Sequence, residues 1–315
     1  MRKGKLSPAE LKSLIFDIIG KRRDEVSLSA GLGEDCAVLN LNGYILMTSD
    51  PITAKCANQG RLAIYVNAND IAASGGEPLA VVITLLAPVD ADVKDIKSIM
   101  LEAEDAAKEL NIEIAGGHSE FTDAVNRIVL SCTMIGKVIK PVASSTGKAG
   151  DSIVMTKYAA IEGTLILADL SDISETDRED YNYLYRSLSV LEEGKLASGM
   201  NISAMHDITE GGVFGAVFEM CEGQGAEITV KDIPMLKLTE KLVNKYNLNP
   251  YQLISSGSML IATPEPDKLI NALESHGIKA SVIGKVNDTG RVIADYGDKK
   301  VEITAMPDEI LKVTH

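Results

Sequence analysis

The sequence has few cysteines and no long apolar run, and each absence excludes a class of protein. Its 315 residues include four cysteines, Cys36, Cys56, Cys132 and Cys221, and no two of them form a C-x-x-C pair. This spacing argues against a zinc site, and so few cysteines in so long a chain argue against a secreted disulfide framework. The longest strongly apolar run, 79–88, is far shorter than the roughly 20 residues that span a bilayer.

The sequence also lacks an excess of basic charge. It carries 31 basic and 45 acidic residues, a net charge of −14. Nucleic acids and anionic membranes attract basic surfaces, so neither is expected as the main partner. An anionic substrate remains compatible if a metal ion neutralises it. The charged N-terminus runs directly into an amphipathic helix instead of a secretory signal, and we therefore expect a cytoplasmic protein.

The length and one polar stretch predict two domains. At roughly 100–200 residues per domain, the chain is long enough for two. Residues 141–151 are small, polar and rich in turn formers, which indicates a boundary between domains at 1–145 and 150–315. The segment Ser-Ser-Thr-Gly-Lys within this stretch is not a P-loop, because it lacks the leading glycine and the Ser or Thr after the lysine.

Hydrophobic periodicity predicts alternating helices and strands in both halves. Ser7, Pro8 and Glu10 form a helix-start signal, and Gly75–Gly76 end a helix that begins near Gly60. The expected helices are 7–19, 60–74, 92–110, 165–170, 179–198, 239–246 and 266–276, with another after the loop 206–211. The expected strands are 44–48, 79–86, 112–115, 127–138, 152–156, 228–230, 258–262, 280–283 and 291–295.

The helix from Gly60 carries polar residues on a largely apolar frame. Asn67 and Asp70 are three apart, so they project from one helical face. A solvated edge of an amphipathic helix is the simplest interpretation. Two acidic segments upstream, which contain Asp35 and Asp50, favour a functional interpretation instead.

If Asp35, Asp50 and Asp70 converge, they need a cation. Two like charges about 4 Å apart repel by roughly 4 kcal/mol at an effective dielectric near 20. Mg²⁺ binds through one or two carboxylates plus substrate phosphates, so it would turn the cluster into a favourable site. Taken singly, an aspartate of this kind is more often a turn residue or a helix cap than a metal ligand.

Two glycine pairs could expose backbone N–H groups to an anion. Gly116–Gly117 precede His118, which could donate to a phosphate or accept a proton. Gly211–Gly212 precede a helix, where free N–H groups and the helix dipole attract anions. A turn with a surface histidine remains the alternative for the first pair. Cys36 could be a nucleophile or a small buried residue.

Taken together, these segments resemble the aminoimidazole ribonucleotide (AIR) synthetase superfamily. Relatives there include thiamine-monophosphate kinase, selenophosphate synthetase and the hydrogenase maturation protein HypE. GEDCAV is similar to its G-D-D-A-A-V loop, TSDP to its T-T-D strand end, and NANDIAASGGEP to its N-x-N-D helix. GGHSE, DITEGGVFGAV and ISSGSMLIA complete the match in the same order, with the last two nearest to HypE.

The resemblance implies an α+β fold and an ATP site. A PurM-like N-terminal domain with a four-stranded sheet would join its copy across a homodimer into a β-barrel, and the C-terminal domain would be an α+β sandwich. ATP would lie near the dimer interface with Mg²⁺. The implied metal ligands are Asp35, Asp50 and Asp70, the implied phosphate-binding residues are Gly33, Asn67, Gly116, Gly117, Gly211 and Gly212, and the implied catalytic residues are His118 and Asp207.

The departures from the family pattern limit the activity. No cysteine follows Cys221, so chemistry on a C-terminal thiol, as in HypE, is not available. His118 stands where the kinase has a metal-binding aspartate. We expect an ATP- and Mg²⁺-dependent enzyme that phosphorylates an oxygen of a small molecule. The alternatives are a nucleotide-binding assembly or regulatory protein with little turnover, or a protein that keeps only the fold.

Overall fold

The computed structural model describes residues 4–31, 36–53, 58–221 and 223–313. The chain forms two compact units, one from Met1–Ile71 and Glu77–Val138 and the other from Ala72–Gly76 and Ile139–His315. The division into domains at 1–145 and 150–315 stays a prediction.

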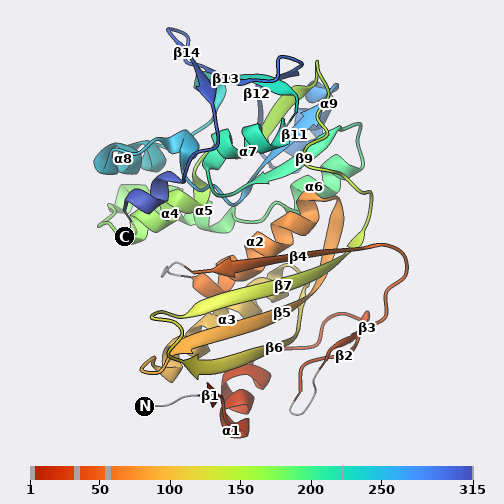
Figure 1. The fold of residues 1–315 in the computed structure, drawn as a ribbon, viewed down its shortest axis with the longest axis vertical. Coiled ribbons are helices and arrows are strands. Elements are labelled where there is room, and N and C mark those ends of the chain that lie inside the picture. Colours follow the sequence, from red (N-terminus) through yellow and green to blue (C-terminus); the bar gives the residue numbers. More distant parts are fainter. Residues whose placement is uncertain (1–3, 32–35, 54–57, 222, 314–315) are drawn as a thin grey trace. The chain divides into compact units, whose positions relative to one another are not determined.

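The first unit is built on a mixed sheet in the order β1-β6-β5-β7-β4 (Figure 1). Strands β5 and β6 are parallel, whereas β1–β6 and β4–β7 are antiparallel. A separate ribbon pairs β2 with β3. The resemblance implied four strands, and the two-residue β1 adds a fifth. The bounds are β1 Gly4–Lys5, β2 Val26–Leu28, β3 Val38–Leu39, β4 Ile45–Ile52, β5 Gly76–Pro88, β6 Glu113–Thr122 and β7 Val129–Val138.

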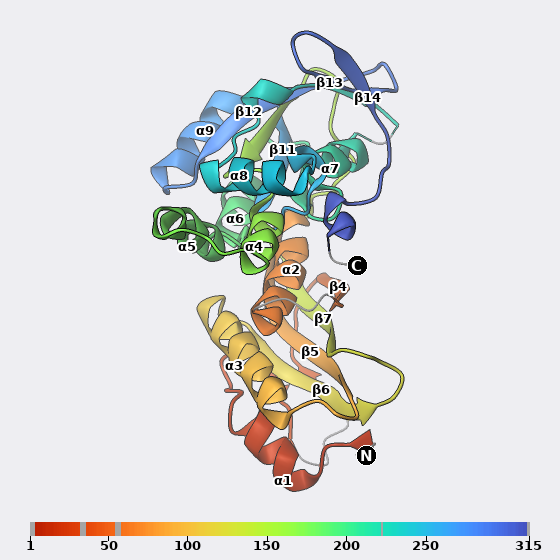
Figure 2. The same cartoon turned by 90° about the vertical axis from the view of Figure 1, so that its left-hand side faces the viewer.

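Helices α2 (Gln59–Ala73) and α3 (Val93–Glu109) cover one face of this sheet (Figures 1 and 2). In α3 the buried residues Ile96, Met100, Ala103 and Ala107 recur every three or four positions, which is the stripe a helix needs to pack on a sheet. Asp92 caps α3 by accepting a hydrogen bond from the Lys94 backbone N–H.

Two local predictions for the first unit need correction. The capping box between Ser7 and Glu10 is present, but the helix divides into α1 (Pro8–Leu11) and a π-helical turn over Lys12–Phe16. Strand β6 does not stop at Gly116–Gly117. It continues because β5 is long enough to pair with it as far as Pro88 opposite Thr122. A Cβ at Gly117 would lie 2.0 Å from the Ile83 carbonyl oxygen, so this glycine permits the close approach of the two strands.

The described part of the second unit contains a seven-stranded sheet in the order β14-β13-β10-β12-β8-β11-β9. Its strands are β8 Ser152–Thr156, β9 Ala204–Ile208, β10 Gly225–Thr229, β11 Ser258–Thr263, β12 Ala280–Asn287, β13 Val292–Asp295 and β14 Lys300–Ile303. Its helices are α4 Ile161–Asp169, α5 Arg178–Arg186, α6 Leu191–Ser198, α7 Gly212–Met220, α8 Lys237–Tyr246 and α9 Pro266–Ser275.

Helices cover both faces of this second sheet. Ile153 and Met155 of β8 pack in the apolar cluster that includes residues of α7, whereas Val154 packs in the cluster that includes residues of α6 and α9. Because successive strand residues point to opposite faces, β8 is buried on both sides. The predicted α+β class and the sandwich are thereby confirmed, while the barrel across a dimer stays a prediction.

The predicted helix over 179–198 is broken into α5 and α6. The buried ammonium of Lys157 donates to the carbonyl oxygens of Ser187 (3.0 Å) and Ser189 (2.5 Å), and it forms an ion pair with Glu193 (2.6 Å). Carbonyls that accept from this side chain leave the helical ladder, so the chain kinks between the two helices. Among the residues that the structure describes, no helix has the length and apolarity required to cross a membrane.

Candidate functional site

Helix α2 holds the edge strand β4 through its two polar residues. The Oδ1 atom of Asn67 accepts the Asp50 backbone N–H at 3.0 Å, while its Nδ2 donates to the Ala63 carbonyl oxygen at 2.9 Å. Asp70 Oδ2 accepts from the Thr48 hydroxyl at 2.5 Å. Asn67 is fully buried, so the solvated-edge interpretation is wrong for it. The structure thus brings the side chains of Asn67 and Asp70 into contact with β4, and the spacing had placed these two residues on one helical face.

The chemistry of this place suits a hard cation. Asp50 is half-buried and lies opposite Cys132 of β7. Burial, and then the negative charge of Asp50, raises the pKa of the Cys132 thiol to about 12. No set of three His, Cys, Asp or Glu residues in the described ranges could hold a metal ion. Asp35 lies outside those ranges, and two carboxylates with phosphate oxygens match the usual Mg²⁺ environment.

The glycine pair of β6 and His118 line a cavity of about 690 Å³. Gly31 and Cys36, on either side of the predicted acidic loop, line the same cavity. Gly33 and Asp35 themselves fall outside the described residues. The His118 Nε2 atom lies 3.2 Å from a carboxylate oxygen of Glu120. Because β5 and β7 separate β6 from β4, the cavity strand and the Asp50 strand are roughly 14 Å apart at ordinary strand spacing.

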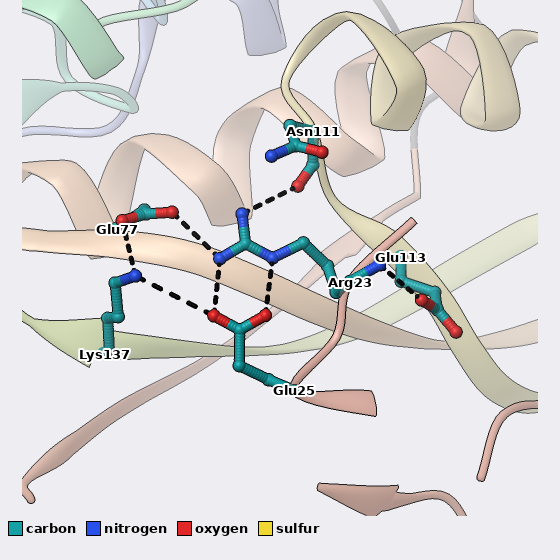
Figure 3. A network of polar contacts seen from close by, with 6 residues as sticks. All are labelled: Arg23, Glu25, Glu77, Asn111, Glu113 and Lys137. Atoms are coloured by element: carbon teal, nitrogen blue, oxygen red, sulfur yellow. Dashed lines mark hydrogen bonds and ion pairs between the residues drawn. The ribbon is translucent and has the colours of Figure 1, made fainter. Parts of the chain in front are cut away.

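A charged network that the sequence analysis missed anchors the segment leading into β2 (Figure 3). Arg23 donates to both carboxylate oxygens of Glu25 (3.1 and 2.9 Å) and to Glu77 at 2.9 Å. A further nitrogen reaches the Asn111 carbonyl oxygen, and Lys137 pairs with Glu77 at 2.9 Å. The hydrogen bonds from Arg23 lower the pKa of Glu25. This geometry ties the base of the β2–β3 ribbon to β5, β7 and the turn before β6.

A third carboxylate, that of Glu113, reinforces the same anchor. Glu113, at the start of β6, is fully buried and accepts the backbone N–H groups of Arg22 and Arg23, each at 2.9 Å. From the sequence alone, the charged run 21–25 has the composition of a solvated loop. The anchoring role of this run could not be predicted from the sequence, because its partners lie about 50 to 90 residues further along the chain.

In the second unit, the glycines at the start of α7 are already hydrogen-bonded within the chain. Gly211 donates its N–H to Asp308 Oδ2 at 2.6 Å, and Gly212 donates to the Thr209 carbonyl oxygen at 3.1 Å. The anion at this helix N-terminus is therefore the Asp308 carboxylate. The N-cap residue of α7 is Gly211. Asp207 lies in β9 with 5% of its surface exposed.

Backbone conformation explains both glycines without a ligand. Gly211 has φ +82° and Gly212 has φ +62°, in the left-handed region that favours glycine. A Cβ at Gly212 would lie 2.7 Å from the Leu253 carbonyl oxygen. Phosphate binding by these glycines, and a catalytic role for Asp207, stay predictions.

Glu162 of α4 is a buried acid that the sequence analysis did not single out. Burial, assisted by the negative charge of Asp308, raises its pKa to about 7. The nearby Ser256 hydroxyl offsets part of this rise in pKa. Among the described residues, neither that hydroxyl nor Glu162 Oε2 has a partner at hydrogen-bond geometry. Burial also raises the pKa of Asp308.

Comparisons with known proteins agree with this architecture. Sequence models of the AIR synthase related protein match residues 33–138 as its N-terminal domain and residues 148–297 as its C-terminal domain. A protein of Methanocaldococcus jannaschii, whose name places it with hydrogenase expression/formation proteins, is 27% identical over 294 residues, 87% of each chain. The selenide, water dikinase of Methanococcus maripaludis is 29% identical, with 95% of this chain and 96% of the relative covered.

A solved structure shows the same fold. The crystal structure of hydrogenase maturation protein HypE in complex with ATP aligns with a TM-score of 0.81 at 18% identity, covering 97% of this chain and 96% of that one. The two domain matches follow each other in order and together cover most of the chain. The chain therefore belongs to the AIR synthase related protein family.

Proposed function

We propose that this protein is an ATP- and Mg²⁺-dependent enzyme that transfers a phosphoryl group to an oxygen of a small-molecule substrate. The observation that carries the proposal is the contact between α2 and β4, in which Asp70 accepts from Thr48 and Asn67 accepts the backbone N–H of Asp50. One aspartate on each of two rigid elements that are joined by a fully buried amide suits a site that must hold a cation in one position.

The names of similar proteins support the same reaction class. HypE has been solved with ATP, and a relative that spans 95% of this chain is named a dikinase. Mg²⁺ bound by the carboxylates would neutralise the phosphate charge of ATP. In our proposal, Gly116 and Gly117 turn backbone N–H groups to the phosphates, and His118 orients the transferred group. Asp35 completes the metal ligands. The roles predicted for Asp207, Gly211 and Gly212, which lie in the second unit, stay predictions, and the N–H groups of both glycines already have partners within that unit.

Removing one carboxylate charge tests this assignment. In Asp70→Asn the amide oxygen can still accept from Thr48, so the fold is kept while the charge is lost. We expect Mg²⁺-dependent ATP binding, measured by calorimetry, to weaken at least about tenfold, which corresponds to roughly 1.4 kcal/mol. Asp105→Asn, at an exposed position of α3, is the matched control. Equal ATP affinity in the wild type and both variants would contradict the assignment of Asp70 to a metal site.

The alternative is a nucleotide-binding assembly or regulatory protein with little or no turnover. It requires only that the described groups bind the nucleotide, because binding and turnover use the same carboxylates and backbone N–H groups. A single-turnover assay for phosphate release or transfer separates the two: binding without any transfer supports the alternative.

We also propose a homodimer formed through the uncovered face of the first sheet. Tyr44, Ile45 and Met47, at and just before β4, expose 87%, 50% and 70% of their surface. Exposed apolar groups on an edge strand favour association with another chain. In sedimentation experiments we expect the wild type to be a dimer and Met47→Asp to be a monomer. A monomeric wild type would contradict the proposed dimer and its barrel. We also propose a cytoplasmic location for the protein, because the sequence has few cysteines and its longest apolar run is too short to span a bilayer.

A further inference from the structure

The cavity beside His118 is a well-formed chamber in the first unit. Its wall on one side is the N-terminal helical segment, with Ile15 and Phe16, and on the other side β6. The base of the β2–β3 ribbon, with Ala37, closes a third side. Its volume of about 690 Å³ falls within the range of small-molecule sites in proteins, roughly 300–1,000 Å³.

The lining of the chamber is mostly apolar, with a few polar side chains. We call its apolar residues the floor; they come from the helical segment, the sheet and α3 and include Leu11, Ile15, Phe16, Ile19, Met100 and Ile114. We call its polar residues the rim; they are Lys5, Ser29, Thr84, His118 and Ser119. Such a lining takes a ligand with an apolar body and one polar end.

The charge of the lining is opposite to that of the chain. Acidic residues outnumber basic ones 45 to 31 in the sequence, yet the described residues that line the chamber include Lys5 and His118 and no aspartate or glutamate. Glu120 stands opposite Lys5 in the β1–β6 register, but its carboxylate contacts His118 at 3.2 Å. In the described part of the chain, the Lys5 ammonium has no ion-pair partner. The rim therefore offers one cation to an incoming anion.

We propose that this chamber binds the phosphate acceptor, and that the acceptor is a small carboxylic acid with an apolar body. This rests on the function proposed above. The body lies on the floor beside Ile15 and Phe16, and the carboxylate lies at the rim with Lys5. Gly116 and Gly117 border the same rim, so a phosphoryl group held on their backbone is next to the acceptor oxygen.

The reaction balances without a further reagent. One carboxylate oxygen attacks the γ-phosphorus of ATP and forms a new P–O bond. The bond from the γ-phosphorus to the β–γ bridging oxygen breaks, and ADP leaves with that electron pair. The products are an acyl phosphate and ADP, and no proton has to be removed from the attacking carboxylate.

Two probes that share a chain and differ in charge test the binding step. Octanoate and 1-octanol are titrated into the nucleotide-free protein by calorimetry. We expect both to bind, with octanoate tighter. Lys5→Met should weaken octanoate binding roughly three- to fivefold, the upper size of an exposed ion pair, and leave 1-octanol binding unchanged. Equal loss for both probes would contradict the role of the cation.

A filling variant locates the site. Ala37→Phe places a ring in the chamber from the ribbon, and it should weaken both probes about tenfold or more because the floor is no longer free. Ala91→Phe, at a half-exposed turn position after β5, is the control and should bind like the wild type. If neither probe binds the wild type, or if Ala37→Phe binds them normally, the chamber is not a ligand site.

Turnover separates this inference from the function on which it rests. With Mg²⁺ and ATP, octanoate should stimulate ADP release, and hydroxylamine should trap the acyl phosphate as a hydroxamate. If ATP binds with Mg²⁺ and no hydroxamate forms, the acceptor class is wrong while the nucleotide site stands. If ATP does not bind at all, the proposed function fails, whatever the octanoate titrations show.

Discussion

Glu162 makes the folding stability of the second unit depend on pH. Its side chain is buried and its pKa rises from 4.5 to about 7, chiefly because burial disfavours the charged form. The native state therefore holds this proton more tightly than the unfolded chain does. The contribution to stability is fully present below about pH 4.5 and is lost as the pH rises to about 7.

The size of the loss follows from the two pKa values. At roughly 1.4 kcal/mol per pH unit, the rise from 4.5 to about 7 corresponds to about 3 kcal/mol. Glu162→Gln keeps the shape of the side chain and cannot ionise. The difference in free energy of unfolding between Glu162→Gln and the wild type should therefore change by about 3 kcal/mol, in favour of the variant, as the pH rises from 4.5 to 8.

Urea unfolding at a series of pH values measures this difference. The chain has no tryptophan, and Tyr44 and Tyr65 are the tyrosines of the first unit, so the other seven of the nine report on the second unit through their fluorescence. Glu274→Gln, at an exposed position of α9, serves as the control. A difference between wild type and Glu162→Gln that stays constant from pH 4.5 to 8 would refute the reasoning.

Three further substitutions test the structure. Arg23→Met should cost about 2–3 kcal/mol in urea unfolding because the buried guanidinium loses its hydrogen bonds to the partly exposed Glu25 and Glu77, whereas Arg291→Met, in an exposed pair, should cost less than about 1 kcal/mol. Equal costs would contradict the anchoring role. Asp308→Ala should cost about 1–2 kcal/mol as a lost helix cap, and Asp308→Asn should recover most of it. Gly117→Ala should force β5 and β6 apart and raise amide exchange in β6, and unchanged exchange would contradict the close contact.

The parts of the fold that local chemistry determines could be predicted. The capping box at Ser7 and Glu10 formed, and strand β8 occupies the expected residues 152–156. The placement of Asn67 and Asp70 on one helical face was also correct, because three-residue spacing is a local property of a helix.

The parts that depend on distant partners could not be predicted. Arg23 meets a carboxylate 54 residues away, and the start of α7 meets one 97 residues away. The break between α5 and α6 depends on Lys157, 30 residues before the carbonyl of Ser187. Periodicity within a window of 11–18 residues carries no information about such contacts.

The metal site stays a prediction. The sequence could not show whether Asp50 and Asp70 converge; in the structure Asp70 accepts from Thr48 of β4, and Asn67 of α2 accepts the backbone N–H of Asp50. Asn67 thereby accepts an N–H that β4, as an edge strand, leaves unpaired in the sheet. This role could not be predicted, because the sequence does not give the order of the strands. The acidic loop with Asp35 lies outside the described residues, so its part in the site stays a prediction.

The distance along the chain between Gly211 and Asp308 has a consequence during translation. The two residues are 97 positions apart. At roughly 5–20 residues per second, the ribosome adds Asp308 about 5–20 s after Gly211. During that interval a nascent α7 has no carboxylate from Asp308 at its N-terminus, and the N–H of Gly211 is open to water or to other anions. The second unit therefore completes this contact late, after most of its sheet has been synthesised.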